Sequence, residues 1–224
     1  MENINKNFII KTLTFWNKLD NQQQESILNN TNYKLYKKGD NIHGLENDCA
    51  GILLIKSGEL RVYILSEDGR EVTLYRLNDG DICILSASCI LKNITFDVFI
   101  NAEQDSEVLI INPAVFQKIC SENIYAENFS HQKTVDRFSD VMWAMQQILF
   151  MSFDKRMAVF LLDEISKNGS DSISLTHEQI AKYVGSAREV VSRMLKYFEN
   201  ERIVNLYRGG LKVIDKKKLR KLIL

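Results

Sequence analysis

Apolar and polar positions follow two different rhythms along the chain. In the N-terminal half, glycine-containing turn signals separate short apolar runs. The runs cover residues 49–55, 60–65, 72–77, 82–85, 96–102 and 108–111. Short strands with regularly spaced turns are typical of an antiparallel barrel or sandwich. We therefore predict a β domain, with a short helix over residues 15–29 leading into it.

From residue 113 onward the apolar positions recur with helical spacing. Pro113, the chain's only proline, favours the start of a short helix over residues 114–120. A longer helix is predicted over residues 123–152, and a further one over 154–167. The chain is expected to bend near Ser152, between these two helices.

The longest predicted helix carries an apolar seam with spacings of four, three and four. Its members are Phe138, Met142, Met145 and Leu149. This is coiled-coil spacing, and a single seam of that type needs a partner. A two-fold related copy of the chain is our preferred partner, which predicts a homodimer. Packing of the seam against the chain's own barrel is the alternative.

Residues 173–195 have the pattern of a helix-turn-helix. Thr176 is a candidate N-cap, with Gln179 at the capping-box position. Gly185 can supply the left-handed turn, and Ser186 is predicted to cap a second helix. The inward face of that helix would be Val190, Val191, Met194 and Leu195. The outward face would be Arg188, Glu189, Ser192 and Arg193.

A β-hairpin is predicted directly after this helix pair, over residues 203–207 and 211–214 with an Arg-Gly-Gly turn. A hairpin in that place is a wing. The whole chain is neutral, with 29 basic and 29 acidic residues, but residues 176–224 carry twelve Lys and Arg against five Asp and Glu. This excess of positive charge favours DNA binding over a merely solvated charged face.

The segment THEQIAKYVGSAREVVSRMLKYFENERIV, residues 176–204, resembles the DNA-binding domain of the Crp/Fnr family of transcription regulators. The resemblance extends over nearly the whole chain. It implies an α+β fold with an N-terminal cyclic-nucleotide-binding-type β jelly roll, a long dimerisation helix and a C-terminal winged helix-turn-helix. We expect the three parts to cover residues 1–112, 113–152 and 153–224.

The outward face of the second helix matches the positions with which that family reads bases. The resemblance implies that Arg188 and Arg193 contact guanines, that Glu189 accepts from cytosine, and that Ser192 helps to set the outer bases. Arginine is bidentate to guanine and glutamate can accept from cytosine, so the chemistry agrees. We therefore expect a palindrome with TGA-containing half-sites. Contacts to the DNA backbone are expected from Thr176, His177, Ser186, Arg208 and Lys212. RNA polymerase is a further expected partner.

The effector of the β domain is harder to infer. Family members that bind cyclic AMP use a Gly-Glu pair and a later arginine, whereas residues 80–102 here contain neither glutamate nor arginine. Lys92 is the only cation of this stretch, and Asp81 and Asp97 would repel a phosphate. The pattern therefore does not favour cyclic AMP.

Iron cofactors are disfavoured by the cysteine and histidine positions. The four cysteines, at 49, 83, 89 and 120, lack cluster spacing, and none lies near the N-terminus, which argues against an iron–sulfur cluster. In the haem-binding carbon-monoxide sensors of the family, the ligand positions fall on Ile84 and Ser86 here. Haem is therefore an alternative of lower rank, and we predict no metal site.

We predict an effector pocket that contains Cys83, Ser86, Ser88 and Cys89. These residues predict either a small-ligand site or a thiol switch, which would need a partly exposed thiolate. The alternative is that both cysteines are small buried hydrophobes.

Other classes of function fit less well. The chain shows no nucleophile–base pair, no metal-ligand cluster and no phosphate loop, so we do not expect an enzyme. A ligand-binding protein that does not read DNA is the competing class. The chain has no apolar run of membrane-spanning length and no disulfide-like cysteine spacing, which predicts a cytoplasmic protein. The family resemblance implies a bacterial one.

Overall fold

The computed structural model describes the chain except for residues 1, 45–49, 85 and 87–97. Its residues form two compact units, each with its own core. One unit contains residues 1–64 and 74–141, and the other contains residues 65–73 and 142–224. The boundaries that we expected at residues 112 and 152 stay a prediction.

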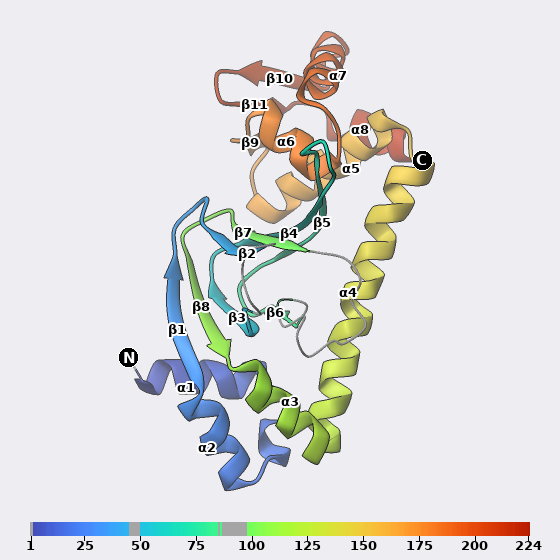
Figure 1. The fold of residues 1–224 in the computed structure, drawn as a ribbon. Coiled ribbons are helices and arrows are strands. Elements are labelled where there is room, and N and C mark those ends of the chain that lie inside the picture. The colour runs from blue at the N-terminus through green and yellow to red at the C-terminus, as the bar shows by residue number, and fades with distance from the viewer. Residues whose placement is uncertain (1, 45–49, 85, 87–97) are drawn as a thin grey trace. The chain divides into compact units, whose positions relative to one another are not determined.

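The first unit is built on two four-stranded sheets within the described residues (Figure 1). One sheet has the order β1 (Thr31–Tyr36), β8 (Ser106–Ile111), β3 (Ile52–Ser57) and β6 (Ile82–Cys83). The other has the order β2 (Asn41–His43), β7 (Phe99–Ala102), β4 (Leu60–Leu65) and β5 (Glu71–Leu77). Apolar side chains of both sheets, such as Leu53 and Ile100, are fully buried. The predicted β fold is confirmed.

Two strands of these sheets were not predicted. In β1, the apolar side chains of Tyr33 and Leu35 are exposed and only Tyr36 is buried, so the strand lacks the buried apolar face of the central strands. Strand β2 is three residues long, too short for a pattern. Both are held by pairing with later strands, β1 with β8 and β2 with β7.

Helices gather at one end of the sheets (Figure 1). They are α1 (Glu2–Thr12), a 3-10 turn at Trp16–Lys18, α2 (Asn21–Asn29) and α3 (Pro113–Glu122). The single helix expected over residues 15–29 is wrong, because Leu19 and Asp20 have extended backbones. Asp20 instead begins α2 with a capping box to Gln23. Asn112 caps α3, and Pro113 occupies its first turn as expected.

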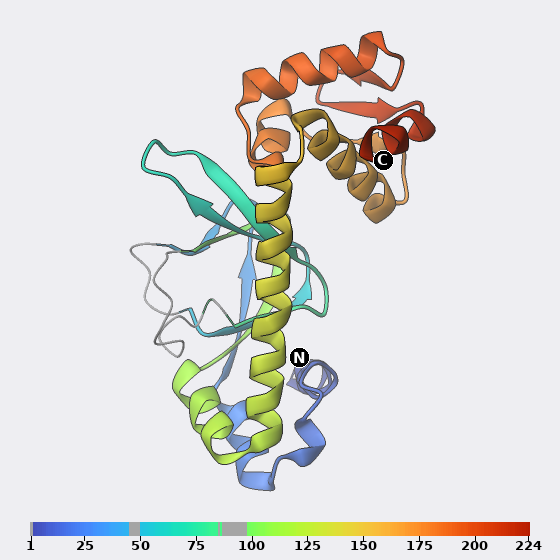
Figure 2. The same cartoon turned by 90° about the vertical axis from the view of Figure 1, so that its right-hand side faces the viewer.

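Helix α4 (Ile124–Phe150) runs without interruption for 27 residues, close to its predicted bounds (Figure 2). At 1.5 Å per residue, such a helix is about 40 Å long. Only Ala126 and Phe129, near its start, are buried.

The C-terminal unit contains α5 (Phe153–Asn168), β9 (Ser172–Ile173), α6 (His177–Val184), α7 (Arg188–Asn200), β10 (Val204–Tyr207), β11 (Gly210–Val213) and α8 (Lys216–Ile223). Its core joins α5, α6, α7 and the hairpin through side chains such as Leu161, Val191 and Phe198, which are fully buried. The predicted helix pair and wing are confirmed. Neither β9 nor α8 was predicted: β9 has two residues, and the sequence analysis assigned no element beyond residue 214.

Candidate nucleic-acid interface

Helix α6 begins with the predicted capping box and ends at the predicted glycine. The Thr176 hydroxyl accepts from the backbone N–H of Gln179 (3.2 Å), and the Thr176 N–H donates to Oε1 of Gln179 (2.9 Å). Gly185 adopts the left-handed conformation with φ 62° and ψ 50°. These local signals fix both ends of α6. The Thr176 hydroxyl, for which we expected a contact to the DNA backbone, already accepts a hydrogen bond within the capping box.

The start of α7 differs from our prediction. Ala187, not Ser186, is the N-cap, and no side chain caps the helix. The backbone N–H of Ser186 donates to the carbonyl of Ala181 at 3.0 Å. Ser186 therefore belongs to the turn that follows Gly185, one residue too early to cap α7, and its role at the DNA backbone stays a prediction.

The two faces of α7 differ as the sequence pattern predicts. Val191 and Leu195 are fully buried, whereas Arg188, Glu189 and Arg193 are exposed. Within the part of the chain that the structure describes, these three charged side chains have no hydrogen-bond or ion-pair partner. Their charges are therefore available to an external ligand.

Ser192, the fourth member of the outward face, is held by another helix. Its Oγ lies 2.8 Å from Nδ1 of His177, the first residue of α6, and both residues are half-buried. The sequence analysis predicted different contacts for the two residues: Ser192 with bases, and His177 with the DNA backbone. The sequence pattern carried no signal of this contact, because it depends on how α6 packs on α7.

The wing is a tight hairpin. Tyr207 pairs with Gly210, leaving Arg208 and Gly209 as a two-residue turn in which Gly209 has φ 89°. A Cβ at Gly210 would collide with the carbonyl oxygen of Ile173 in β9, so the third strand requires glycine there. The sequence pattern placed Gly210 in the turn, and pairing places it in β11.

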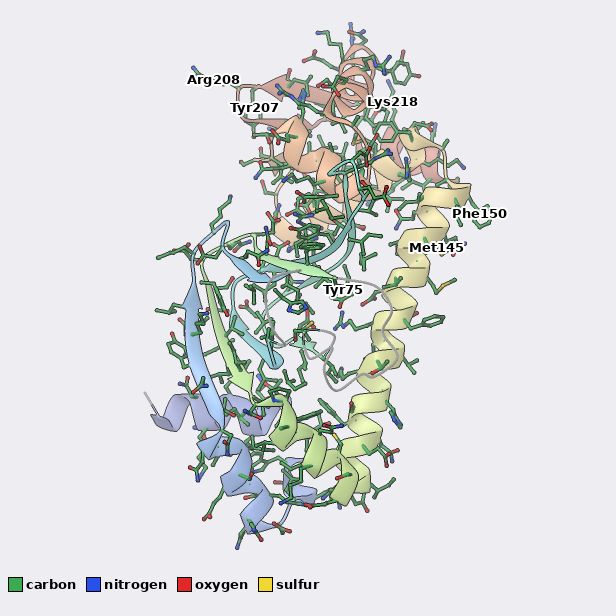
Figure 3. All side chains as sticks on the ribbon, in the orientation of Figure 1. Tyr75, Met145, Phe150, Tyr207, Arg208 and Lys218 are labelled. Carbon is green, nitrogen blue, oxygen red and sulfur yellow. The ribbon has the colours of Figure 1, made fainter. Side chains whose placement is uncertain are left out.

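Two basic side chains of the wing are exposed. Arg208 extends from the turn and points away from the hairpin (Figure 3), and Lys212 is exposed on β11. Both carry the positive charge and the exposure that a phosphate contact requires, and that role stays a prediction.

The predicted seam of α4 is exposed. Phe138, Met142, Met145 and Leu149 expose 65%, 45%, 49% and 58% of their surface, and Val135, one turn earlier, exposes 63%. Val135 extends the alternating spacing of three and four, and our sequence analysis missed it. Val135 and Phe138 belong to the same compact unit as the barrel, and their exposure does not fit the alternative in which this part of the seam packs on it.

Two members of the predicted effector pocket, Cys83 and Ser86, are among the described residues, and both are fully buried. Burial raises the pKa of the Cys83 thiol above its ordinary value. The Ser86 hydroxyl lies 2.6 Å from the carbonyl oxygen of Gly51 and 3.0 Å from that of Cys83, so it holds the backbone after β6. Ser88 and Cys89 lie outside the described residues, as do Lys92 and Asp97.

Two further residues stand close to Cys83, and the sequence analysis missed them. The guanidinium carbon of Arg137, from α4, lies 5.0 Å from the ring centre of Tyr75 in β5. Burial raises the pKa of the Tyr75 hydroxyl well above its usual range, and Cys83 adds to this effect. The Tyr75 hydroxyl and Nε of Arg137 are buried without a hydrogen-bond partner among the described residues.

Acidic side chains reach the same guanidinium. Asp140 accepts from Arg137 at 2.7 Å, and Asp81 lies 4.0 Å away. The positive charge of Arg137 is therefore partly compensated, while Nε keeps a free N–H. In the described residues, no group of three or more His, Cys, Asp or Glu side chains is arranged to hold a metal ion. No helix of this part of the chain is long and apolar enough to cross a membrane.

Family models match both units. Residues 33–123 match the cyclic nucleotide-binding domain, and residues 155–222 match the Crp-like helix-turn-helix domain. Among curated proteins, the chain is 24% identical over 181 residues to the cAMP-activated global transcriptional regulator CRP of Pasteurella multocida. That alignment covers 78% of this chain and 86% of the relative.

Comparison with solved structures supports the same family and fold. A protein from Eubacterium rectale, described as a transcriptional regulator of the Crp/Fnr family, is 46% identical, with a TM-score of 0.90 and coverage of 93% of this chain and 97% of that one. The c-di-GMP responsive global regulator CLP of Xanthomonas campestris shares the fold, with 18% identity, a TM-score of 0.69 and coverage of 88% and 100%. This chain therefore belongs to the Crp/Fnr family of DNA-binding transcription regulators.

Proposed function

We propose that this protein is a homodimer that reads a palindromic operator with TGA-containing half-sites. The observation that carries the proposal is the outward face of α7, where Arg188, Glu189 and Arg193 are exposed and unpaired among the described residues. Two arginines and a carboxylate within the first six residues of α7 suit guanine and cytosine edges in a major groove. The exposed Arg208 and Lys212 of the wing suit the adjacent phosphates.

The dimer would form through α4. Five apolar side chains, Val135, Phe138, Met142, Met145 and Leu149, follow coiled-coil spacing and are exposed in the single chain. Packing of the same seam from a second copy would bury all of them on a two-fold axis. Such a dimer can present two α7 helices to successive major grooves, about 34 Å apart.

The N-terminal unit would bind a small-molecule effector other than cyclic AMP. Its buried donors with no partner among the described residues, the Tyr75 hydroxyl and Nε of Arg137, lie beside Cys83 in the interior. An effector with an oxygen acceptor would satisfy them, since buried polar groups are normally hydrogen-bonded. We retain Ser86, Ser88 and Cys89 as candidate neighbours. RNA polymerase is the proposed partner through which the bound dimer acts on transcription.

A redox or haem sensor is the alternative. The described geometry does not favour a thiol switch at Cys83, because its side chain is fully buried and its pKa is raised. The thiolate is the reactive form, so a buried protonated thiol is inert. Cys89 lies outside the described residues, and the redox form of the alternative now depends on it.

The decisive experiment is selection of binding sites from random duplex DNA by anaerobically purified protein, repeated after mild thiol oxidation. We expect one palindrome with TGA half-sites in both states, and the Arg188→Ala variant should lose the preference at one base pair of each half-site. A palindrome enriched in one state only would favour the redox alternative. The selection is then repeated with small-molecule fractions of a cell extract added. If no site is enriched with any of them, the protein is a ligand-binding module that does not read DNA.

A further inference from the structure

The contact between His177 and Ser192 joins the start of α6 to the outward face of α7. The distance of 2.8 Å between His177 Nδ1 and Ser192 Oγ is that of a good hydrogen bond. The two residues are 15 positions apart, and both are half-buried. On the same face, Arg188 and Arg193 have no such partner among the described residues.

A serine hydroxyl is ambiguous as a reader of bases. It has one donor hydrogen and two acceptor lone pairs, and the hydrogen rotates to suit its neighbours. An unrestrained serine can therefore contact either an acceptor or a donor on a base edge. Such a residue adds little discrimination unless a second group decides which way the hydrogen points.

His177 is placed to make that decision. If its Nδ1 carries no hydrogen, the serine hydroxyl donates to it, and only lone pairs of Oγ face the groove. If Nδ1 carries a hydrogen, Oγ accepts from it, and the serine hydrogen is available to the groove. A lone pair suits the amino groups of adenine and cytosine, whereas a hydrogen suits thymine O4 or guanine O6 and N7.

We propose that His177 is a specificity-determining residue that acts through Ser192, by fixing the direction of its hydroxyl. This inference rests on the proposed function of α7 as the base-reading helix. It replaces our expectation that His177 serves mainly as a contact to the DNA backbone. His177 is a positioning residue: its imidazole acts on the bases only through the serine.

The test is the relative affinity of the protein for a panel of operators in which only the base pair facing Ser192 is changed. We expect Ser192→Ala and His177→Ala to flatten the preference at that pair by about 2- to 10-fold, the range of one neutral hydrogen bond. The double variant should be no flatter than either single variant, because both remove the same interaction.

Two amide substitutions provide a matched pair. In His177→Asn, the amide falls near the place of Nδ1, so the preference of the wild type should be largely retained. In His177→Gln, the amide falls near the place of Nε2, so the preference should be lost. Glu178→Gln changes an exposed neighbour on α6 and should leave the preference intact. Thermal melting of each variant checks that the fold is unchanged.

Two outcomes overturn the inference. A uniform loss of affinity for all operators with a shallower salt dependence would make His177 a phosphate contact. An unchanged preference in His177→Ala would make the hydrogen bond a purely structural one. Failure of the proposed function is distinguishable, because then the wild type itself would show no preferred operator.

Discussion

The outward face of α7 and the interior of the β-sheet unit use charged side chains in opposite ways. On α7, Arg188 and Arg193 are exposed and have no partner among the described residues. In the β-sheet unit, Arg61 is 2% exposed and bonds Glu103 at 2.7 Å, and Arg137 bonds Asp140 at 2.7 Å. Charges that face solvent are hydrated and can bind an external ligand, whereas charges inside a fold must be paired because burial removes their hydration.

This difference explains why one site was accessible to sequence analysis and the other was not. The ligand of α7 is a polymer with a regular surface, so the residues that contact it follow the period of one helix. The residues that surround Cys83 come from β5, β6 and α4, far apart in the chain. No spacing rule joins Tyr75, Cys83 and Arg137, and only the packed structure brings them together.

The largest effect on DNA binding by α7 should come from disrupting the dimer, which separates the two α7 helices. We expect the double substitution Met142→Asp and Met145→Asp to abolish the dimer, because two carboxylates per chain would be buried in the seam. Affinity for the palindrome should fall by about 10²- to 10⁴-fold, the gain that linkage of two modules normally gives. Analytical ultracentrifugation and DNA binding measure the two effects. Gln147→Glu, which lies off the seam, is the control; a dimer that survives the double substitution would contradict the seam.

Arg188→Ala should have the next largest effect. Loss of a bidentate contact to guanine costs about 1–3 kcal/mol of binding free energy, or about 5- to 150-fold in affinity. The loss should be confined to operators that carry the guanine, so that discrimination at one base pair disappears. Binding to the operator and to single-base variants, measured by fluorescence anisotropy at fixed salt, shows this. An equal loss on every duplex would mean that Arg188 contacts the DNA backbone.

Lys212→Ala should have a smaller and uniform effect. A phosphate contact carries no sequence information, so affinity should fall on all duplexes alike. The slope of log affinity against log salt should become shallower by about 0.9, the contribution of one neutralised phosphate. Lys216→Ala is the control, since Lys216 is already paired with Asp171 at 2.6 Å. A change in base preference in Lys212→Ala would show that the wing reads sequence.

The smallest effect should be the reaction of a thiol reagent with the cysteines of the β-sheet unit. Burial raises the pKa of Cys83, so its thiolate appears only when the pH rises above the ordinary range for a thiol. Burial and Glu127 likewise raise the pKa of Cys120 to about 12. In brief alkylation at neutral pH followed by mass spectrometry, both cysteines should react only after denaturation. Rapid labelling of Cys83 in the native protein would return it to the list of candidate switches.

The sequence-based predictions succeeded where the signals are local. The capping box of Thr176 and Gln179 and the left-handed Gly185 locate α6 to the residue. The apolar spacing of α7 identifies its buried face, although Ser186 proved to be part of the turn and Ala187 the cap. The helix predicted over residues 15–29 failed because Leu19 and Asp20 have extended backbones, and Asp20 caps a separate helix, α2.

The sequence by itself determined the family, the change from strands to helices near residue 113, the apolar seam of α4 and the charged face of α7. The last three depend on a helix or strand period, which neighbouring residues set through backbone geometry. Only the tertiary structure decided the pairing of β9 with β11, the burial of Cys83 and the hydrogen bond between His177 and Ser192. These features join residues that are distant in the chain, and their geometry arises from packing of whole elements, which no local pattern encodes.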